Sequence, residues 1–461
     1  MEQTMKQNKM GTMPVPKLLL NMGIPMVLSM LGQALYNMVD TFFVSHIPDT
    51  AQVAEMGDKA INALTLAYPV QQLIIALMVG IGIATNTMMA KSLGRKDRER
   101  ASQVAGNAIF LTLCVFGVIF LFGAFAARAF IGSQTNDPVV AQLGTTYLRI
   151  VSLGSLGTIG YMGIEKIAMG CGNTRATMIA QLAGAVTNII LDPLMIFGLL
   201  GLPAMGVTGA AWATVIGQFV SLFIIVYVQF FRSKEVDCGL KYWKPNKDIL
   251  KTMFVISLPA TVMQVLVPVM SYGLNLIFGR ISANVVTAYG VYYKMQYFVF
   301  MAVFGLNNAS ISTTAYNFGA KNKARVAQII KYGVLYAVAI TLLGTIVLQV
   351  FAKPLVGLFS VSGESARLCE MALHIVTLGF VFGSVNVILP GVCQALGNGV
   401  YSLIVTLLRY VAVLLPLAFL FSLTAAATTL VWWAIPIAEI VAFAVNVILT
   451  RKLYKARVSI L

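Results

Sequence analysis

Charged residues are scarce in this chain. Asp, Glu, Lys and Arg make up 10% of its 461 residues, whereas hydrophobic residues make up 59%. A soluble domain carries about a quarter charged residues, because its surface must face water. The charges that exist are clustered, and the apolar stretches between them are long enough to cross about 30 Å of hydrocarbon. The composition therefore excludes a soluble globular domain and predicts a protein that lives in lipid.

Residues that commonly hold metals or form cross-links are also few. The two histidines, His46 and His374, lie far apart, and the five cysteines show no paired spacing. These residues are too few and too scattered to form a recognisable zinc site. Their spacing also indicates that the cysteines are small apolar residues of the core and do not form disulfides. No nucleophile–base pair can be read either. We therefore expect neither an enzyme nor a cofactor-dependent protein.

Acidic residues are outnumbered, with 16 Asp and Glu against 32 Lys and Arg, which gives a net charge of +16. Nucleic-acid-binding proteins place such charge on a folded surface beside readable modules. Here the basic residues lie in short segments between apolar runs, chiefly at 91–100, 232–251, 321–331 and 451–457. Cytoplasmic loops carry the Lys and Arg excess of a membrane protein. We therefore expect no nucleic-acid partner, a multi-pass location in the cell membrane, and both termini in the cytoplasm.

Twelve apolar runs predict an all-α, polytopic membrane protein. They fall at roughly 17–44, 60–90, 102–130, 139–170, 174–200, 206–231, 248–280, 283–317, 327–351, 370–397, 400–423 and 426–449. The longest polar connector, 232–250, predicts a cytoplasmic linker. It divides the chain into an N-lobe of spans one to six, residues 1–231, and a C-lobe of spans seven to twelve, residues 251–461.

An internal repeat agrees with this division. Gly94, which opens the basic loop after span two, matches Gly319 after span eight, and Gly172-Asn173 matches Gly397-Asn398. Both matches have an offset of 225 residues. Halves of six spans keep the same orientation, so a pseudo-two-fold axis along the membrane normal should relate them. Such a pair of lobes makes a cleft.

The first apolar run carries a polar face. Gln33, Tyr36, Asn37 and Asp40 are spaced i, i+3, i+4 and i+7, which places them on one side of a helix. An ionisable residue near the bilayer centre costs about 2.5–3.5 kcal/mol on insertion scales, so Asp40 is a candidate functional residue. Pro25 lies two turns upstream and should kink the helix. It is either a hinge or a source of static shape.

A second carboxylate, Asp192, follows in span five. Asn188 lies one turn before it and Gln181 two further turns before that, on the same face. Two carboxylates and an amide carbonyl can ligate a hard cation such as Na⁺. If Asp40 and Asp192 are close, their repulsion instead favours a shared proton. The alternative is a structural hydrogen-bonded pair, and Asp192 before Pro193 could also mark a bend.

Further charges, including Arg409, lie within the apolar runs. Glu165 and Lys166 are adjacent in span four, so their side chains should point in different directions. Glu165 then either joins the cavity of the N-lobe or lies near the cytoplasmic end as an interfacial charge. Lys294 in span eight and Glu439 in span twelve are isolated in the sequence, and each could pair within the second lobe.

Taken together, these residues resemble the multidrug and toxic compound extrusion (MATE) transporters over essentially the whole chain. The resemblance is carried by Pro25 and Asp40 in span one, Gly94 and its basic loop, Gly172-Asn173-Thr174-Arg175, Asn188-Ile-Ile-Leu-Asp192-Pro193 and Gly209-Ala-Ala-Trp-Ala-Thr214. It implies a V-shaped pair of six-helix lobes that exports organic cations by antiport with Na⁺ or H⁺.

The resemblance also implies a site. The branch with its cation site in the N-lobe uses residues that match Asp40, Asn188, Asp192 and Thr214, with Na⁺ possible at the first three. Its nearby cavity uses residues that match Gln33 and Tyr36. Helical spacing adds Asn37 and Gln181 to the expected cavity, and the charge within span four adds Glu165. Another branch has acidic residues in spans seven and ten, where this chain offers only Gln264, Asn275 and Asn386. We therefore expect no cation site in the C-lobe.

Other functions are less well supported by the residues. A lipid-linked precursor flippase of the same wider architecture is the alternative, but it should carry cationic residues in its cavity to hold phosphates. The expected partners are small organic cations and membrane lipid, and nothing requires a second subunit, so a monomer is expected. The sequence leaves open the natural substrate and the choice between Na⁺ and H⁺.

Overall fold

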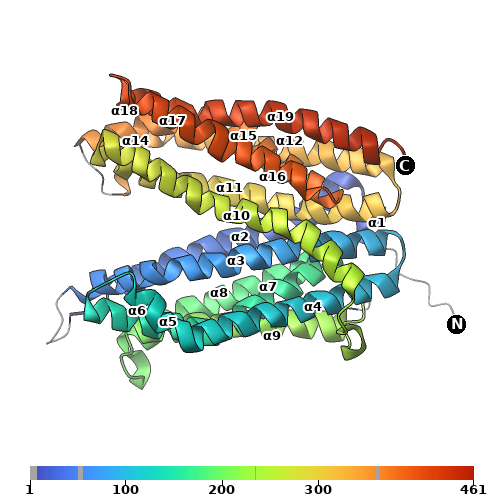
Figure 1. Ribbon diagram of the computed structural model, residues 1–461, viewed down its shortest axis with the longest axis horizontal. Helices are drawn as coiled ribbons and strands as arrows, with labels where there is room; N and C mark the ends of the chain where they lie inside the picture. Colours follow the sequence, from blue (N-terminus) through green and yellow to red (C-terminus); the bar gives the residue numbers. More distant parts are fainter. Residues whose placement is uncertain (1–7, 50–54, 234, 360, 362) are drawn as a thin grey trace. The chain divides into compact units, whose positions relative to one another are not determined.

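The computed structural model describes residues 8–49, 55–233, 235–359, 361 and 363–461 (Figure 1). Every regular element within these ranges is a helix, which confirms the all-α fold class. A chain that crosses hydrocarbon must satisfy its backbone polar groups within each span, and only helices and closed barrels do so. The scarcity of charge and the helical fold therefore have one cause.

Eleven helices within the described residues are long and apolar enough to cross a membrane. Their bounds are Val15–Ser45 (α2), Met56–Gly94 (α3), Arg98–Gly132 (α4 to α5), Thr174–Phe197 (α8), Val207–Arg232 (α9 and a π-helical turn), Lys247–Ile281 (α10), Ala283–Gly319 (α11), Lys323–Val350 (α12), Gly363–Ala395 (α14 and α15), Gly399–Ser422 (α16 and α17) and Ala427–Arg457 (α18 and α19). Shorter helical pieces lie at Lys9–Thr12 (α1) and Ala352–Gly357 (α13).

The predicted fourth span is built from two helices. Pro138–Leu153 (α6) and Leu156–Gly170 (α7) together cover the predicted run 139–170, with Gly154 and Ser155 between them. Each piece is shorter than the roughly 20 residues that a bilayer requires. A side chain at Gly154 would lie 2.7 Å from the methyl groups of Val215 on α9, so close packing there requires glycine. All twelve predicted runs thus correspond to helical segments.

By close packing, the described chain divides into two compact units. The N-unit comprises Leu28–Met89 and Asp97–Ser257, and the C-unit comprises Met1–Val27, Ala90–Lys96 and Leu258–Leu461. Two of the divisions fall inside α2 and α10, near Pro25 and Pro259, where the missing N–H weakens the helical ladder, and another falls inside α3, after Met89. The boundaries expected from the sequence, with lobes at 1–231 and 251–461 and a linker at 232–250, remain predictions.

Each unit has its own apolar core. The core of the N-unit includes Ile74, Met78, Ile131 and Leu148, all buried. In the C-unit, the buried ring of Phe278 packs against Trp432, with ring centroids 5.4 Å apart.

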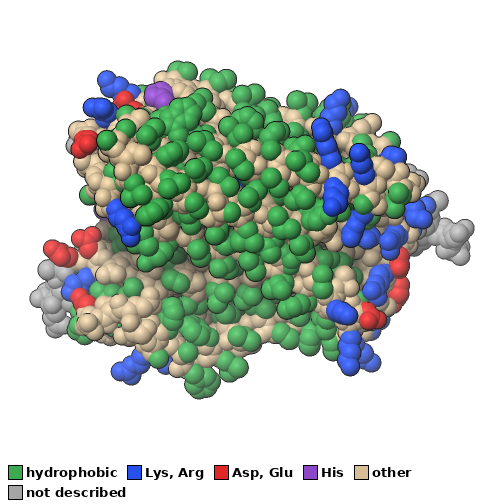
Figure 2. All heavy atoms as spheres, turned by 45° about the horizontal axis from the view of Figure 1, so that its top comes forward, with side chains coloured by type: hydrophobic (Ala, Val, Ile, Leu, Met, Phe, Trp, Pro, Cys, Tyr) green, Lys and Arg blue, Asp and Glu red, His purple; other side chains and the backbone are tan. Residues whose placement is uncertain are grey.

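The surface outside these cores is also apolar. Figure 2 shows hydrophobic side chains over most of one face, with Lys and Arg side chains gathered away from its middle. Phe125 on the N-unit is 82% exposed and Leu343 on the C-unit 64% exposed. Apolar side chains in such numbers on a soluble protein would cause aggregation. They are the surface that lipid contact requires.

Candidate functional site

The candidate site depends on a close approach of two helices of the N-unit, α8 and α9. A Cβ atom at Gly184 on α8 would lie 2.6 Å from the carbonyl oxygen of Gly217 on α9. At the same crossing, the Ser221 hydroxyl of α9 donates a hydrogen bond of 2.9 Å to the carbonyl of Ala180 on α8. Small residues let membrane helices pack backbone to backbone. The crossing therefore brings together the polar side chains one turn beyond it.

Those side chains are Asn188 and Asp192 on α8 and Thr214 on α9. The Asn188 amide Nδ2 donates to Asp192 Oδ1 at 3.3 Å and to the Thr214 hydroxyl oxygen at 3.4 Å. Asp192 is fully buried and Asn188 is 2% exposed. Three residues that the sequence assigned to the cation site therefore lie in one contact group.

Asp40 on α2 lies within electrostatic range of this group. Its carboxylate is close enough to that of Asp192 for the two negative charges to interact. Asp40 Oδ1, Asn188 Oδ1 and Asp192 Oδ2 are buried and have no hydrogen-bond partner among the described residues. Buried polar atoms are normally paired, because an unpaired one costs about 1–3 kcal/mol. Three unpaired acceptors around two carboxylates form a site that a hard cation or a proton would satisfy.

The structure adds two residues that sequence reasoning missed. The Tyr147 hydroxyl of α6 lies within electrostatic range of Asp40, Asp192 and Tyr36. It accepts a hydrogen bond of 3.1 Å from Gln71 Nε2 of α3. Buried tyrosines are common in apolar runs, and Gln71 is followed by another glutamine, so no sequence signal distinguishes them. Only the packing of α3 and α6 brings them to the carboxylates.

A small pocket adjoins this group. Tyr36, Gln181, Asn188 and Thr214 line it, together with Gly184, Ala185, Gly217, Gln218 and Ser221. It offers about 10 Å³ to the centre of a water molecule, which is room for roughly one water or a dehydrated ion. Of the predicted cavity residues, Tyr36 and Gln181 thus reach the pocket. Gln33 is half-buried and Asn37 is exposed on α2.

Glu165 has a different environment from the one expected. Its side chain forms an ion pair of 3.3 Å with Lys166, and both side chains are buried. The expectation that adjacent residues on a helix point apart was therefore wrong for this pair. Both side chains are long and flexible, and a buried charge without a partner is costly. Because Lys166 balances its charge, Glu165 is not a free carboxylate of the cavity.

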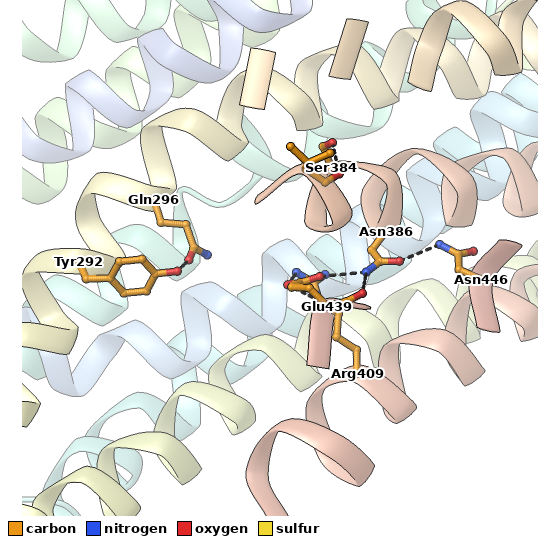
Figure 3. A network of polar contacts seen from close by, with 8 residues as sticks. Tyr292, Gln296, Ser384, Asn386, Arg409, Glu439 and Asn446 are labelled. Atoms are coloured by element: carbon orange, nitrogen blue, oxygen red, sulfur yellow. Dashed lines mark hydrogen bonds and ion pairs between the residues drawn. The ribbon is translucent and has the colours of Figure 1, made fainter. Parts of the chain in front are cut away.

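The C-unit contains a buried ion pair of its own. Glu439 on α19, isolated in the sequence, accepts hydrogen bonds from Arg409 and Asn386 (Figure 3). Lys294 instead lies 6.0 Å from the ring centroid of Phe359. The sequence placed Arg409 within an apolar run but could not give its partner, which is 30 residues away on another helix.

Comparisons with known proteins agree with this arrangement. The MatE family model matches residues 25–194 and 259–420, which together make up well over half of the chain. The multidrug export protein MepA of Staphylococcus aureus strain MSSA476 is 27% identical over 425 residues, covering 91% of this chain and 90% of that protein. MepA of Staphylococcus saprophyticus is 26% identical over 416 residues, covering 90% and 89%.

Solved structures show the same fold. A crystal structure of MATE in complex with MaL6 has a TM-score of 0.91 at 26% identity, covering 98% of this chain and 99% of that one. The outward-facing conformation of a multidrug resistance MATE family transporter of the MOP superfamily also has a TM-score of 0.91 at 26% identity, covering 99% of both chains. The match of the family model to both halves of this helical membrane protein shows that the chain belongs to the MATE family of transporters.

Proposed function

We propose that this transporter exports organic cations from the cell in exchange for Na⁺ or H⁺, by alternating access. The observation that carries the proposal is the group of unpaired acceptor oxygens on Asp40, Asn188 and Asp192. An isolated buried carboxylate is costly, and two within electrostatic range are costlier still. Binding of one cation or one proton relieves both costs, so the site should be occupied whenever the ion gradient supplies it.

The coupling follows from where the two carboxylates lie. Asp40 belongs to α2 and Asp192 to α8, so an ion that bridges them favours the arrangement in which these helices are close. A substrate that prefers the opposite arrangement is then released as the ion binds, since coupling needs only opposite preferences. Pro25, earlier on α2, is the proposed hinge, because the helix lacks one backbone hydrogen bond there.

The substrate class follows from charge. The N-unit presents two carboxylates beside the amide and hydroxyl groups of Tyr36, Gln181 and Thr214. These groups attract cations, and none of them carries the positive charge with which a lipid-linked precursor flippase would hold phosphates. The relatives described as multidrug export proteins agree with small organic cations as substrates. We further propose that the protein acts as a monomer, with both termini in the cytoplasm.

The test is transport by purified protein in vesicles with Na⁺ and pH gradients imposed separately. A fluorescent organic cation should move with one gradient, and Asp40→Asn should lower that rate at least tenfold, because it keeps the volume and removes the charge. Asp58→Asn is the matched control, since Asp58 is exposed in the first turn of α3. Undiminished transport by Asp40→Asn would refute the site. Lipid scrambling without cation transport would favour the flippase.

A further inference from the structure

The internal repeat extends to the candidate site. Three residues that line the pocket of the N-unit are Gly184, Thr214 and Ser221. The residues 225 positions later, at the offset of the loop glycines, are Arg409, Glu439 and Asn446. In the C-unit, Glu439 contacts Arg409 directly and joins Asn446 through Asn386.

The burial pattern supports this correspondence. Along α9 the buried residues include Gly209, Ala211, Ala213, Gly217, Ser221 and Ile225, and along α19 they include Ala434, Pro436, Ala438, Ala442, Asn446 and Thr450. Each member of the second set follows its counterpart by 225 residues. The two helices thus present the same face to their own units, and Glu439 occupies the place of Thr214.

In the C-unit this place is filled by a charge of the chain itself. Arg409 Nε donates to Glu439 Oε1 at 2.8 Å, and its Nη2 donates to the same oxygen. Asn386 Nδ2 donates to Glu439 Oε2 at 2.9 Å, and Asn386 Oδ1 accepts from Asn446 Nδ2 at 3.3 Å (Figure 3). The side chains of Arg409 and Glu439 are 13% and 10% exposed. Both oxygens of this carboxylate therefore have donors.

The surroundings of Glu439 are shaped around its side chain. A Cβ atom at Gly379 would lie 3.5 Å from Glu439 Cγ, and one at Gly383 would lie 3.4 Å from its carboxyl carbon and 3.0 Å from the Phe300 ring. The Arg409 guanidinium also lies 4.9 Å from the ring centroid of Tyr410. The carboxylate of Glu439 is held in place by the amide donor of Asn386, and an aromatic ring lies nearby. A carboxylate beside an aromatic ring has the composition of a site for an organic cation.

We propose that the C-unit contains a cation site, with Glu439 as its carboxylate, and that the Arg409 guanidinium is its tethered occupant. Arginine keeps its proton throughout the physiological range, so this occupant neither leaves nor neutralises. One carboxylate oxygen each of Asp40 and Asp192 is unpaired, whereas both oxygens of Glu439 have donors. Exchange of ions with the surroundings is then confined to the N-unit. The proposal concerns a different unit and does not depend on the identity of the coupling ion.

The test removes the guanidinium group of Arg409 and supplies a free guanidinium compound in its place. Purified Arg409→Ala should bind methylguanidinium at least tenfold more tightly than the wild-type protein does. Binding is measured as the rise in melting temperature with methylguanidinium added at millimolar concentrations. Urea, an uncharged molecule of similar shape, should have no such effect. Arg409→Ala combined with Glu439→Gln is the matched control, because the cavity stays and the carboxylate charge is lost. Equal binding by wild-type protein, or none by Arg409→Ala, would overturn the proposal.

The proposal can also be tested if Arg409→Ala fails to fold. Removal of one partner of a buried ion pair leaves the other charge uncompensated, whereas removal of both does not. If Arg409→Ala cannot be purified, the double variant Arg409→Ala/Glu439→Gln should be recovered in at least several times the yield. Equal or lower yield of the double variant would show that Arg409 does not serve to neutralise Glu439, and the tethered-cation proposal would fail.

Discussion

Replacement of Gly184 by alanine should separate α8 from α9 and disrupt the candidate site without changing any of its polar groups. The new Cβ atom would clash with the Ser221 side-chain oxygen, and it would lie 2.6 Å from the backbone carbonyl oxygen of Gly217, which cannot rotate away. Favourable contacts of carbon begin near ~3.5 Å, so relief of this clash requires a local shift of up to about 0.9 Å. Overpacking of this kind typically costs about 1–3 kcal/mol.

The shift should be felt one turn away. The hydrogen bond from Asn188 to Thr214 already measures 3.4 Å, near the limit for such a bond, and it joins the same two helices. We expect Gly184→Ala to lower the melting temperature of the purified protein and to reduce ion-driven efflux several-fold. Melting is followed by fluorescence of the protein in detergent, and efflux in vesicles.

Two further variants make this test sharper. Gly117→Ala on α4 is the matched control, because no atom lies within 4 Å of the new Cβ among the described residues, and alanine favours a helix. It should leave stability equal or higher. Gly184→Ala combined with Ser221→Ala removes the hydroxyl that also crowds Gly184, yet it should remain destabilised because the Gly217 carbonyl stays. Wild-type stability and transport in Gly184→Ala would refute the close-packing argument.

Two other predictions concern the ends of the helices. Asn107→Ala removes the acceptor of a 2.8 Å hydrogen bond from the Asn246 backbone N–H, which should cost about 1–2 kcal/mol and speed trypsin cleavage of the linker; an unchanged digestion rate would contradict this. Asp137 caps the N-terminus of α6. The hydrogen bond from the Val140 backbone N–H is the largest cause that lowers the pKa of Asp137 below the ordinary 3.8, and the neighbouring Lys59 lowers it further. Its stabilisation is present above pH 3.8 and is lost as pH falls through the lower folded pKa, so Asp137→Ala should be less stable than wild type at pH 7 and similar at strongly acidic pH. Melting curves across pH check this, and a constant difference would contradict it.

Helical periodicity was sufficient to find most of the candidate site. Gln181, Asn188 and Asp192 share one face of α8, and they lie together because their spacing follows the helix repeat. Tyr147 and Gln71 could not be found in this way, since nothing in the spacing of the polar residues of their spans distinguishes them from their neighbours. Their place beside the carboxylates is set by which helices pack together.

Charges within the spans show the same division. Glu165 and Lys166 are adjacent, and a helix wheel places them apart, yet burial makes their flexible side chains converge. Arg409 and Glu439 are 30 residues apart, and only the packing of their helices makes them a pair. In both cases the ion pair forms because a buried charge without a partner is costly. The sequence shows that each charge needs a partner, but it does not show which residue the partner is.

The sequence by itself determined that this protein crosses the membrane, that its spans are helices, and that Asp40 and Asp192 lie on polar faces of their helices. These follow from transfer of side chains and backbone groups into hydrocarbon, which depends on composition and on the helical repeat alone. The tertiary structure decided that Asn188 reaches Thr214, that one carboxylate oxygen each of Asp40 and Asp192 remains without a donor, and that Arg409 and Asn386 satisfy Glu439. Those facts depend on how closely helices approach, which glycines such as Gly184 permit but only packing fixes.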